Sequence, residues 1–381
     1  MPTATDRIPL LSPAPGTERS LLVHRFGVPG ARPRAYLHAA LHADEWPGLL
    51  VLQHLMVLLE EALARGAIIG EVVVVPFANP IGLAQAVNQH VLGRYDLAAG
   101  GNFNRDFPDL ATRLEPGIDK KLVAGPDENV ARLRALLAEA VAALPRETES
   151  DALKATLLEL STPSDLVFDL HCEGEALAHV YALARQQELA KELANHLGAP
   201  VVLLEEDAGG NAFDQANSGP WRKLAAHLGR GKGLPLACFA TTVELRGQAD
   251  VHDDYAEADA KGLLRFLQRR GVVAGDPGPL PPTRCRATPL NGMDVLTAPS
   301  AGVVAYCKQL GDRVMAGEVV AELVTLKGSD PVAGRTPIRS RADGIFFARM
   351  AEKFARPGQS VCKIAGAEDL PHRVDGNLLS D

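Results

Sequence analysis

Two side chains suited to binding a divalent metal, His42 and Glu45, stand three residues apart directly after an apolar run. An imidazole and a carboxylate at this spacing can hold one ion from a single turn of the chain. A zinc ion that performs chemistry takes three protein ligands from His, Glu, Asp or Cys and leaves a fourth position open for water. The pair alone is a weak signal and is more often a solvated helix start, so its meaning depends on a third ligand elsewhere.

A third ligand and a candidate base follow at the ends of two later apolar runs. His171 could complete a metal site with His42 and Glu45, although a histidine at the end of a strand is often structural. Glu244 could take a proton from metal-activated water and pass it to a leaving nitrogen. A bound zinc ion lowers the pKa of water to about 7 and polarises a carbonyl. The alternative for Glu244 is an ion-paired surface glutamate.

Three residues between these elements could bind the oxygens of a substrate. Arg105 carries a planar guanidinium that matches the two oxygens of a carboxylate, and the adjacent Asn104 adds an amide. Arg94, brought back by a short Gly-rich loop, could stabilise a carbonyl oxygen as it becomes an oxyanion. In the alternative interpretation Arg105 pairs with Asp106 or Asp109 to hold the loop, and Arg94 is a solvated loop arginine.

The composition is that of a globular protein with a large core: 46% of the 381 residues are hydrophobic and 23% are charged. The net charge of −8, without a block of like charge, argues against nucleic acid and anionic membranes as partners. No run reaches the ~20 apolar residues that span a bilayer. The N-terminal residues lack the apolar region of a secretory signal. The five scattered cysteines contain no C-x-x-C pair, which predicts reduced thiols in a cytoplasmic protein.

The first two thirds of the chain alternates β-branched runs with helical patterns. This order predicts an α/β fold with a mostly parallel mixed sheet and helices on both faces. The predicted strands are 34–41, 71–77, 165–170, 201–205 and 237–245, and the predicted helices are 46–65, 186–197 and 256–270. A helical insertion without strands is predicted at about 111–161. Parallel sheets place their sites at the carboxyl ends of strands, where the candidate ligands stand.

A stiff Pro- and Gly-rich linker at 275–284 predicts a boundary between a catalytic domain, residues 1–274, and a β-rich C-terminal domain, residues 285–381. Two half-repeats of strand, turn and strand in the second domain indicate a small β-barrel. Their pattern resembles the barrel-sandwich hybrid fold of biotinyl and lipoyl carriers. Lys327 stands in Val-Thr-Leu-Lys-Gly-Ser, which does not match the modified lysine of a carrier. A structural barrel is therefore favoured.

Together these motifs resemble the zinc carboxypeptidase superfamily, and within it the succinylglutamate desuccinylase/aspartoacylase family. The residues that carry the likeness, in family order, are His42-x-x-Glu45, Asn79-Pro-x-Gly82, Asn104-Arg105, Asp169-x-His171 and Thr242-x-Glu244. The resemblance covers about 34–270. It implies one Zn²⁺ per chain held by His42, Glu45 and His171, with Glu244 as the base and with Asn104 and Arg105 as substrate-binding residues.

The chain departs from the family pattern at two places. The usual His-Gly-Asn-Glu reads His42-Ala-Asp-Glu45, and Asn102 stands where relatives carry an aspartate two residues before the Asn-Arg pair. If that aspartate supports a zinc-binding histidine, Asn102 would accept the same hydrogen bond without a charge. These changes leave the reaction class standing but weaken any inference about the substrate.

We therefore expect a zinc-dependent hydrolase that cleaves an amide bond in a small N-acyl amino acid, or a related amide with a free carboxylate. A metallocarboxypeptidase or a murein-peptide amidase acting on longer peptides is the alternative within the same chemistry. A ligand-binding or carrier module is the alternative from another class. Association into a homo-oligomer is left open. Gly209–Phe213 and Trp221 could line the pocket as loop residues, although a Gly-rich turn is the simpler interpretation.

Overall fold

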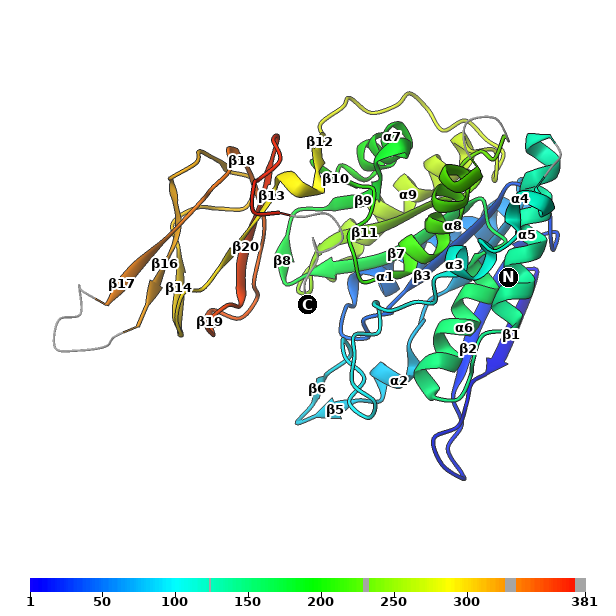
Figure 1. Ribbon diagram of the computed structural model, residues 1–381, viewed down its shortest axis with the longest axis horizontal. Coiled ribbons are helices and arrows are strands. Elements are labelled where there is room, and N and C mark those ends of the chain that lie inside the picture. Colours follow the sequence, from blue (N-terminus) through cyan, green and yellow to red (C-terminus); the bar gives the residue numbers. More distant parts are fainter. Residues whose placement is uncertain (123–124, 229–232, 326–333, 374–381) are drawn as a thin grey trace.

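A nine-stranded sheet runs through the larger part of the molecule (Figure 1). The computed structural model describes residues 1–122, 125–228, 233–325 and 334–373. The strand order is β1-β2-β4-β3-β7-β11-β9-β10-β12. The strands are β1 (Ala4–Pro9), β2 (Ser20–Gly27), β3 (Arg34–Ala39), β4 (Glu71–Val75), β7 (Leu166–Glu173), β9 (His179–Leu183), β10 (Val201–Glu205), β11 (Phe239–Gly247) and β12 (Arg286–Pro289).

The sheet is mixed and mostly parallel, as predicted. Strands β4, β3, β7 and β11 run parallel to one another, and so do β9, β10 and β12. Antiparallel pairs join β1 to β2, β2 to β4, and β11 to β9. The parallel strands are buried along most of their length, which explains their continuous Val- and Leu-rich sequences.

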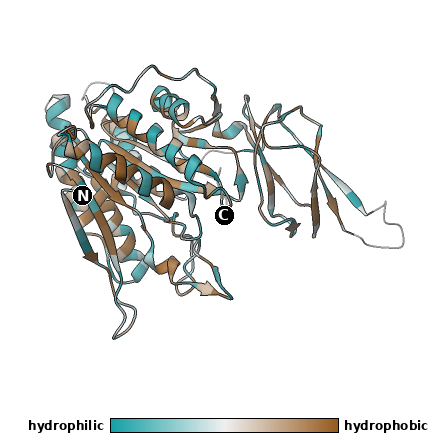
Figure 2. Ribbon diagram, turned by 180° about the vertical axis from the view of Figure 1, so that it is seen from behind, coloured by the Kyte–Doolittle hydropathy of each residue, from teal (hydrophilic) through white to brown (hydrophobic). Residues whose placement is uncertain are grey.

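Helices cover both faces of this sheet. On one face lie α1 (Pro47–Ala64), α7 (Gln187–Leu197) and α9 (Asp253–Arg269), which share a core with Leu52, Phe168 and Phe266. On the other face lie α3 (Leu110–Leu114), α4 (Ile118–Lys121), α5 (Pro126–Ala142), α6 (Glu149–Ser161) and α8 (Phe213–Leu228). Figure 2 shows apolar strands between these layers. Helices α3 to α6 occupy the predicted insertion.

Helix α1 is long and apolar enough to pass a test for a membrane-spanning segment, and it is the one such helix among the residues described. It packs against α9, β3 and β7 through a buried stripe that includes Val51, Leu55 and Leu59. A Cβ on Gly48 would come within 2.9 Å of the Ala39 Cβ atom, so glycine lets the helix approach the sheet closely. These contacts are those of a core helix.

After α9 the chain reaches β12, which pairs with β10 at the edge of the large sheet. The remaining strands form two antiparallel sheets around a small apolar core. One sheet has the order β13-β20-β18-β15, with β13 (Met293–Thr297), β20 (Ser360–Gly366), β18 (Gly344–Arg349) and β15 (Arg313–Val314). The other has the order β17-β16-β14-β19, with β17 (Arg335–Arg339), β16 (Val319–Val324), β14 (Gly302–Tyr306) and β19 (Phe354–Ala355).

Hydrogen bonds among the described residues do not close these two sheets into one barrel, so the predicted barrel is not confirmed. A short strand of the larger, N-terminal part of the chain, β8 (Glu175–Ala176), extends the first of them by pairing with β18. Lys327 lies outside the described residues. One other expectation needs correction. Residues 213–228 form a helix, and Trp221 is buried in the core on its inner side and is therefore not a loop residue of the pocket.

Candidate active site

The predicted ligands meet at the carboxyl ends of neighbouring strands. The chain leaves β3 through Ala40, whose φ of 57° turns the backbone sharply, and then reaches His42 and Glu45 before α1 begins. His171 lies near the end of β7, the next strand of the sheet. Glu244 stands beside His171 in the parallel register of β11 and β7. The parallel sheet thus gathers residues that are up to 200 positions apart in the sequence.

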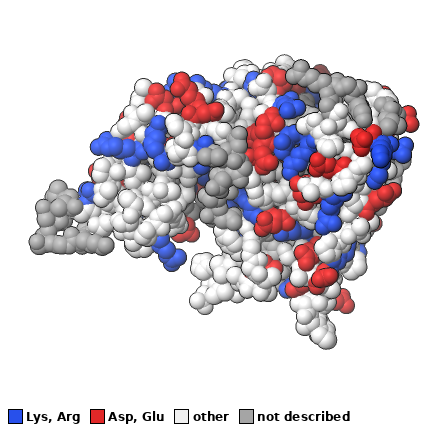
Figure 3. Space-filling model, viewed as in Figure 1, with Lys and Arg blue, Asp and Glu red and all other residues white. Residues whose placement is uncertain are grey.

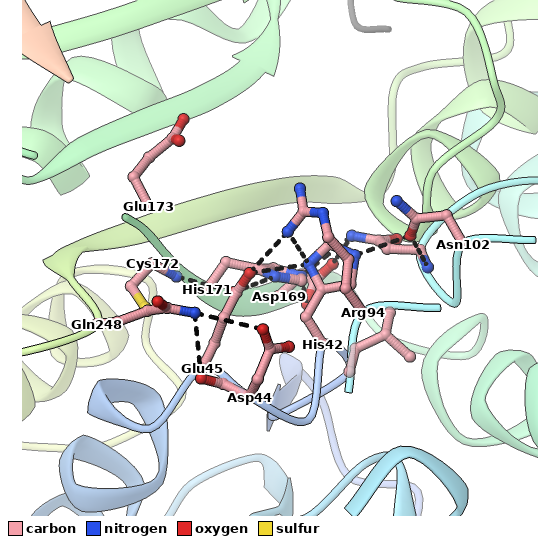
Figure 4. A network of polar contacts seen from close by, with 12 residues as sticks. His42, Asp44, Glu45, Arg94, Asn102, Asp169, His171, Cys172, Glu173 and Gln248 are labelled. Atoms are coloured by element: carbon pink, nitrogen blue, oxygen red, sulfur yellow. Dashed lines mark hydrogen bonds and ion pairs between the residues drawn. The ribbon is translucent and has the colours of Figure 1, made fainter. Parts of the chain in front are cut away.

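His42, Glu45 and His171 offer ligand atoms that all lie within 4.8 Å of one another, and all three side chains are buried. The Nδ1 atom of His42 lies 3.0 Å from Glu45 Oε1, and the Nδ1 atom of His171 lies 2.8 Å from Glu45 Oε2 (Figure 4). Two imidazole nitrogens therefore face one carboxylate across a small space. Two histidines and a carboxylate are a donor set typical of catalytic zinc.

The outer nitrogens of both histidines are held by protein oxygens. His42 Nε2 donates to the Oδ1 atom of Asn102 at 2.8 Å, the contact predicted for this asparagine. His171 Nε2 lies 2.7 Å from Asp169 Oδ1, which also meets His38 Nε2 at 2.7 Å. Such partners fix the tautomer that leaves Nδ1 free to bind a metal. The outer nitrogen of His42 is thus held by an uncharged amide oxygen, and that of His171 by a charged carboxylate.

The charges around these ligands suit a divalent cation. Burial, together with Arg94, lowers the pKa of His42 to about 4, so its imidazole is neutral near pH 7. Burial alone would raise the pKa of Glu45, but the two histidines outweigh it and hold this pKa well below its usual range. For His171, Asp169 and Glu45 outweigh burial and raise the pKa. The neutral imidazole of His42, the carboxylate of Glu45 and the imidazole of His171, which Asp169 holds, are a donor set that fits zinc. A zinc ion would have to displace a proton from His171 in order to bind there.

Arg94 reaches the same point from a neighbouring loop. Its Nη1 atom lies 3.0 Å from Glu45 Oε1 and 3.1 Å from His42 Nδ1. A Cβ on Gly93 would lie 2.5 Å from the Asp44 backbone nitrogen, and the Gly93 carbonyl accepts from the amide of Ala43 at 3.0 Å. Glycine thus lets the two loops touch. The oxyanion role of Arg94 stays a prediction.

Asn104 and Arg105 both border the cavity, but their side chains differ in what they already contact. The Asn104 amide donates to Asp169 Oδ2 at 3.0 Å and accepts from the Phe213 backbone amide at 2.9 Å. It therefore braces the residues behind His171, and its contact with substrate stays a prediction. Arg105 Nη1 donates to the Asn104 carbonyl at 2.8 Å.

The alternative pairing of Arg105 with Asp109 loses support in the structure. Asp109 binds Lys223 Nζ at 2.8 Å and caps the start of α3 with its other oxygen. The loop is held instead by Lys154 of α6, whose Nζ donates to the Arg105 carbonyl at 2.7 Å.

Glu244 lies in the same cavity with the properties of a base. One of its carboxylate oxygens, Oε2, is buried and has no hydrogen-bond partner among the described residues. Burial, followed by the negative charges of Glu173 and Glu45, raises the pKa of Glu244 to about 8. A carboxylate with a raised pKa takes up a proton readily near neutral pH.

The cavity has a volume of about 520 Å³ and is lined by both parts of the chain. The catalytic part contributes the candidate ligands, Glu244 and the two arginines. The C-terminal strands contribute Met293, Arg349 and Lys363. Cys172 lies in the wall with a buried thiol, whose pKa burial raises far above its usual range.

Three polar residues in or beside the cavity were missed by the sequence analysis: Glu173 and Lys363 line it, and His179 offers a ligand atom within 4.8 Å of one from Glu173. Lys363 Nζ of β20 forms an ion pair with Glu173 Oε1. No pattern links residues on strands so far apart in the sequence. Glu173 and His179 both follow the Asp169-x-His171 motif in the sequence, and their side-chain types were the available signal.

Comparisons with known proteins find relatives by sequence and by fold. Residues 31–124 match the model of the succinylglutamate desuccinylase/aspartoacylase catalytic domain. A family protein of that name from Shewanella amazonensis is 29% identical, with a TM-score of 0.83 over 95% of this chain and 98% of that one. The corresponding protein from Shewanella frigidimarina is 24% identical, with a TM-score of 0.84 over 95% and 97% of the two chains.

An ectoine utilization protein from Ruegeria pomeroyi is 20% identical and shares the fold, with a TM-score of 0.65 over 97% of this chain and 98% of that one. No curated protein matches the sequence significantly. The resemblance to the succinylglutamate desuccinylase/aspartoacylase family is thereby confirmed, and it supports a hydrolase of the deacylase type.

Proposed function

We propose that this relative of the succinylglutamate desuccinylases and aspartoacylases is a zinc-dependent hydrolase that cleaves the amide bond of a small N-acyl amino acid. The observation that carries the proposal is the convergence of His42, Glu45 and His171 within 4.8 Å, together with a buried carboxylate oxygen of Glu244 that no described residue hydrogen-bonds. This arrangement combines three ligands with a base in one cavity.

A zinc ion held by these three residues would supply a Lewis acid and lower the pKa of water. Residues of the chain itself transfer the proton, stabilise the oxyanion and orient the ligands. Glu244 takes the proton of the attacking water and returns it to the nitrogen that leaves. Arg94, whose guanidinium already lies beside the ligands, stabilises the oxygen of the attacked carbonyl. Asp169 and Asn102 keep the two imidazoles oriented throughout.

The cavity size favours small substrates over long peptides. A volume of about 520 Å³, walled on one side by the C-terminal strands, accommodates an acylated amino acid. On the face seen in Figure 3, acidic and basic side chains are interspersed, which agrees with a small-molecule partner and not with nucleic acid or an anionic membrane. All five cysteines are free thiols, which fits a cytoplasmic enzyme.

Arg105 gives a prediction about what the substrate carries. Its guanidinium borders the cavity, and a free carboxylate near the scissile amide would receive two parallel hydrogen bonds from it. Loss of a charge-assisted bond costs about 1.5–3 kcal/mol, or one to two decades in kcat/KM. Arg105→Ala and Arg105→Lys should both lose this factor on an acid substrate and far less on its amide. An equal loss on both substrates would show that Arg105 only holds the loop.

A hydrolysis panel tests the proposed reaction. The zinc-loaded protein is given N-acetyl, N-succinyl and N-formyl amino acids together with dipeptides and longer peptides, and amine release is measured. We expect turnover of at least one acyl amino acid that exceeds turnover of every peptide. Preferential cleavage of peptides would identify a carboxypeptidase or a murein-peptide amidase. Tight binding without turnover of any substrate would indicate a ligand-binding module.

A further inference from the structure

A second group of metal-ligating side chains lies next to the proposed zinc ligands. Glu173 of β7, His179 of β9 and Glu244 of β11 each offer one ligand atom, and these atoms lie within 4.8 Å of one another. The three strands are neighbours in the sheet, and His179 stands opposite Glu244 in the antiparallel register of β9 and β11. We propose that Glu173, His179 and Glu244 form a second site for a divalent metal ion.

The strongest support is the imidazole of His179, which is fully buried. Its Nδ1 atom donates to the Leu177 carbonyl at 2.9 Å, so Nε2 carries the lone pair of the neutral ring. Nε2 is buried and has no hydrogen-bond partner among the described residues, and it lies 3.9 Å from Glu173 Oε1. The rings of Tyr181 and Phe347 pack against it at 5.4 Å and 4.9 Å and fix its direction. The nitrogen is thus aimed at the two carboxylates.

Glu244 contributes a second orphaned atom, because its Oε2 is also buried without a partner in the described part of the chain. One neutral imidazole and two carboxylates balance the charge of a divalent ion and suit Zn²⁺, Co²⁺ or Mn²⁺. Ligand atoms around a tetrahedral zinc ion lie about 3.4 Å apart, so the side chains need to move by only about 1 Å. In Figure 4, Glu173 points away from the His42, Glu45 and His171 group, and the two sites share no ligand.

Lys363 is the feature that opposes metal binding here. Its ammonium group, carried by β20, forms an ion pair with Glu173 and must leave when a cation arrives. We therefore expect the second ion to bind more weakly than the first and to bind more tightly when Lys363 is replaced. A bound second ion would engage Glu244 and lower turnover at excess metal. Only this last consequence rests on the proposed function.

The test is a metal titration of the full chain loaded with one equivalent of Zn²⁺. Further Zn²⁺ or Co²⁺ is added and followed by calorimetry and, for Co²⁺, by visible absorbance. The wild type should take up a second ion. His179→Phe, which keeps the ring contacts but removes the ligand nitrogen, should keep the first ion and lose at least tenfold in affinity for the second. Lys363→Met should gain about tenfold.

Two outcomes would overturn the second site. One is a wild type that saturates at a single ion, and the other is a His179→Phe variant that binds the second ion as well as the wild type does. Retention of the first ion shows that each variant is folded. If His179→Phe fails to fold, Glu173→Gln is titrated in its place, with the same loss expected. Failure of the zinc proposal is distinguishable, because it would appear as loss of the first ion.

Discussion

At the scale of single residues, the groups behind the proposed ligands decide how strongly the site would bind a metal. Asn102 holds His42 through an uncharged oxygen, whereas Asp169 holds His171 through a charged one. Burial alone would raise the pKa of Asp169, but His171 and His38 outweigh it and hold this pKa well below its usual range. Because the acceptor behind His42 is uncharged, a substitution that gives it a charge can make His42 a stronger ligand.

We expect Asn102→Ala to weaken zinc binding about 10- to 100-fold, because the outer nitrogen of His42 loses its acceptor. Asn102→Asp should tighten binding, since a charged acceptor makes the imidazole a stronger donor to the metal. Competition with a chelator of known affinity measures both changes. Equal zinc affinity in all three proteins would mean that Asn102 does not support the site.

The cluster of His42, Glu45 and His171 was predictable from the sequence, because two short motifs carry all three residues. The H-x-x-E spacing fixes His42 and Glu45 locally, and Asp169-x-His171 places a ligand and its support on one strand. The hydrogen bonds of the Asn104 side chain were not predictable from the sequence. Its amide binds Asp169 and the backbone of Phe213, a contact across more than 100 residues that no local pattern reveals.

At the scale of elements, the contact between the loops around residues 42–45 and 92–95 positions Arg94. We expect Gly93→Ala to lower kcat/KM by at least tenfold, because its Cβ would lie 2.5 Å from the Asp44 nitrogen and push Arg94 away. Gly100→Ala is the matched control for position: a Cβ there meets nothing within 4 Å, although its φ of 76° adds strain. Steady-state kinetics of both variants decide the matter. Equal losses of kcat/KM in both variants would show that backbone strain, and not the loop contact, causes the effect.

The elements that the sequence predicted are those with a strong apolar signal. Strands β3, β4, β7, β10 and β11 are buried along most of their length, and all five occur: β10 with the predicted ends and the others with one or both ends shifted by a few residues. Helix α8 was missed because Gly219 and Pro220 interrupt its pattern, although both lie inside the helix. Strand β1 was missed because its faces alternate between half-buried and exposed, which leaves no apolar run.

At the scale of the whole molecule, the cavity is a product of both parts of the chain. Lys363 meets Glu173, and Arg349 meets Glu175, so ion pairs tie the C-terminal strands to the end of β7. The pairing of β8 with β18 adds backbone hydrogen bonds to this junction. A linker rich in proline predicts a boundary but not which surfaces meet across it. That is why the wall of the cavity could not be derived from the sequence.

Buried acids beside the cavity give the stability of the molecule a pH dependence. Burial, followed by the charge of Asp214, raises the pKa of Glu205 to about 8. The folded chain thus holds a proton that the unfolded chain releases above about pH 4.5, so this contribution to stability is present at acid pH and is lost as the pH rises towards about 8.

We expect Glu205→Gln to gain stability over the wild type as the pH rises from about 5 to about 8. One pKa unit corresponds to about 1.4 kcal/mol, so the gain should be about 1 kcal/mol or more. Thermal or urea unfolding at several pH values measures it. The amide can still meet Gln215, the present partner at 2.7 Å, so the fold should be preserved. A difference that is constant with pH would show that Glu205 titrates normally.

The central claim, that a metal held by His42, Glu45 and His171 and the base Glu244 hydrolyse an amide, is tested most directly by one paired measurement. Zinc content and kcat are determined for the wild type, Glu244→Gln and His171→Ala on the best substrate of the panel. We predict one ion in the wild type and in Glu244→Gln, with kcat of the latter lower by about 10²–10⁴-fold, and loss of the ion in His171→Ala. A Glu244→Gln variant within tenfold of wild-type kcat, or full zinc content in His171→Ala, would contradict the account.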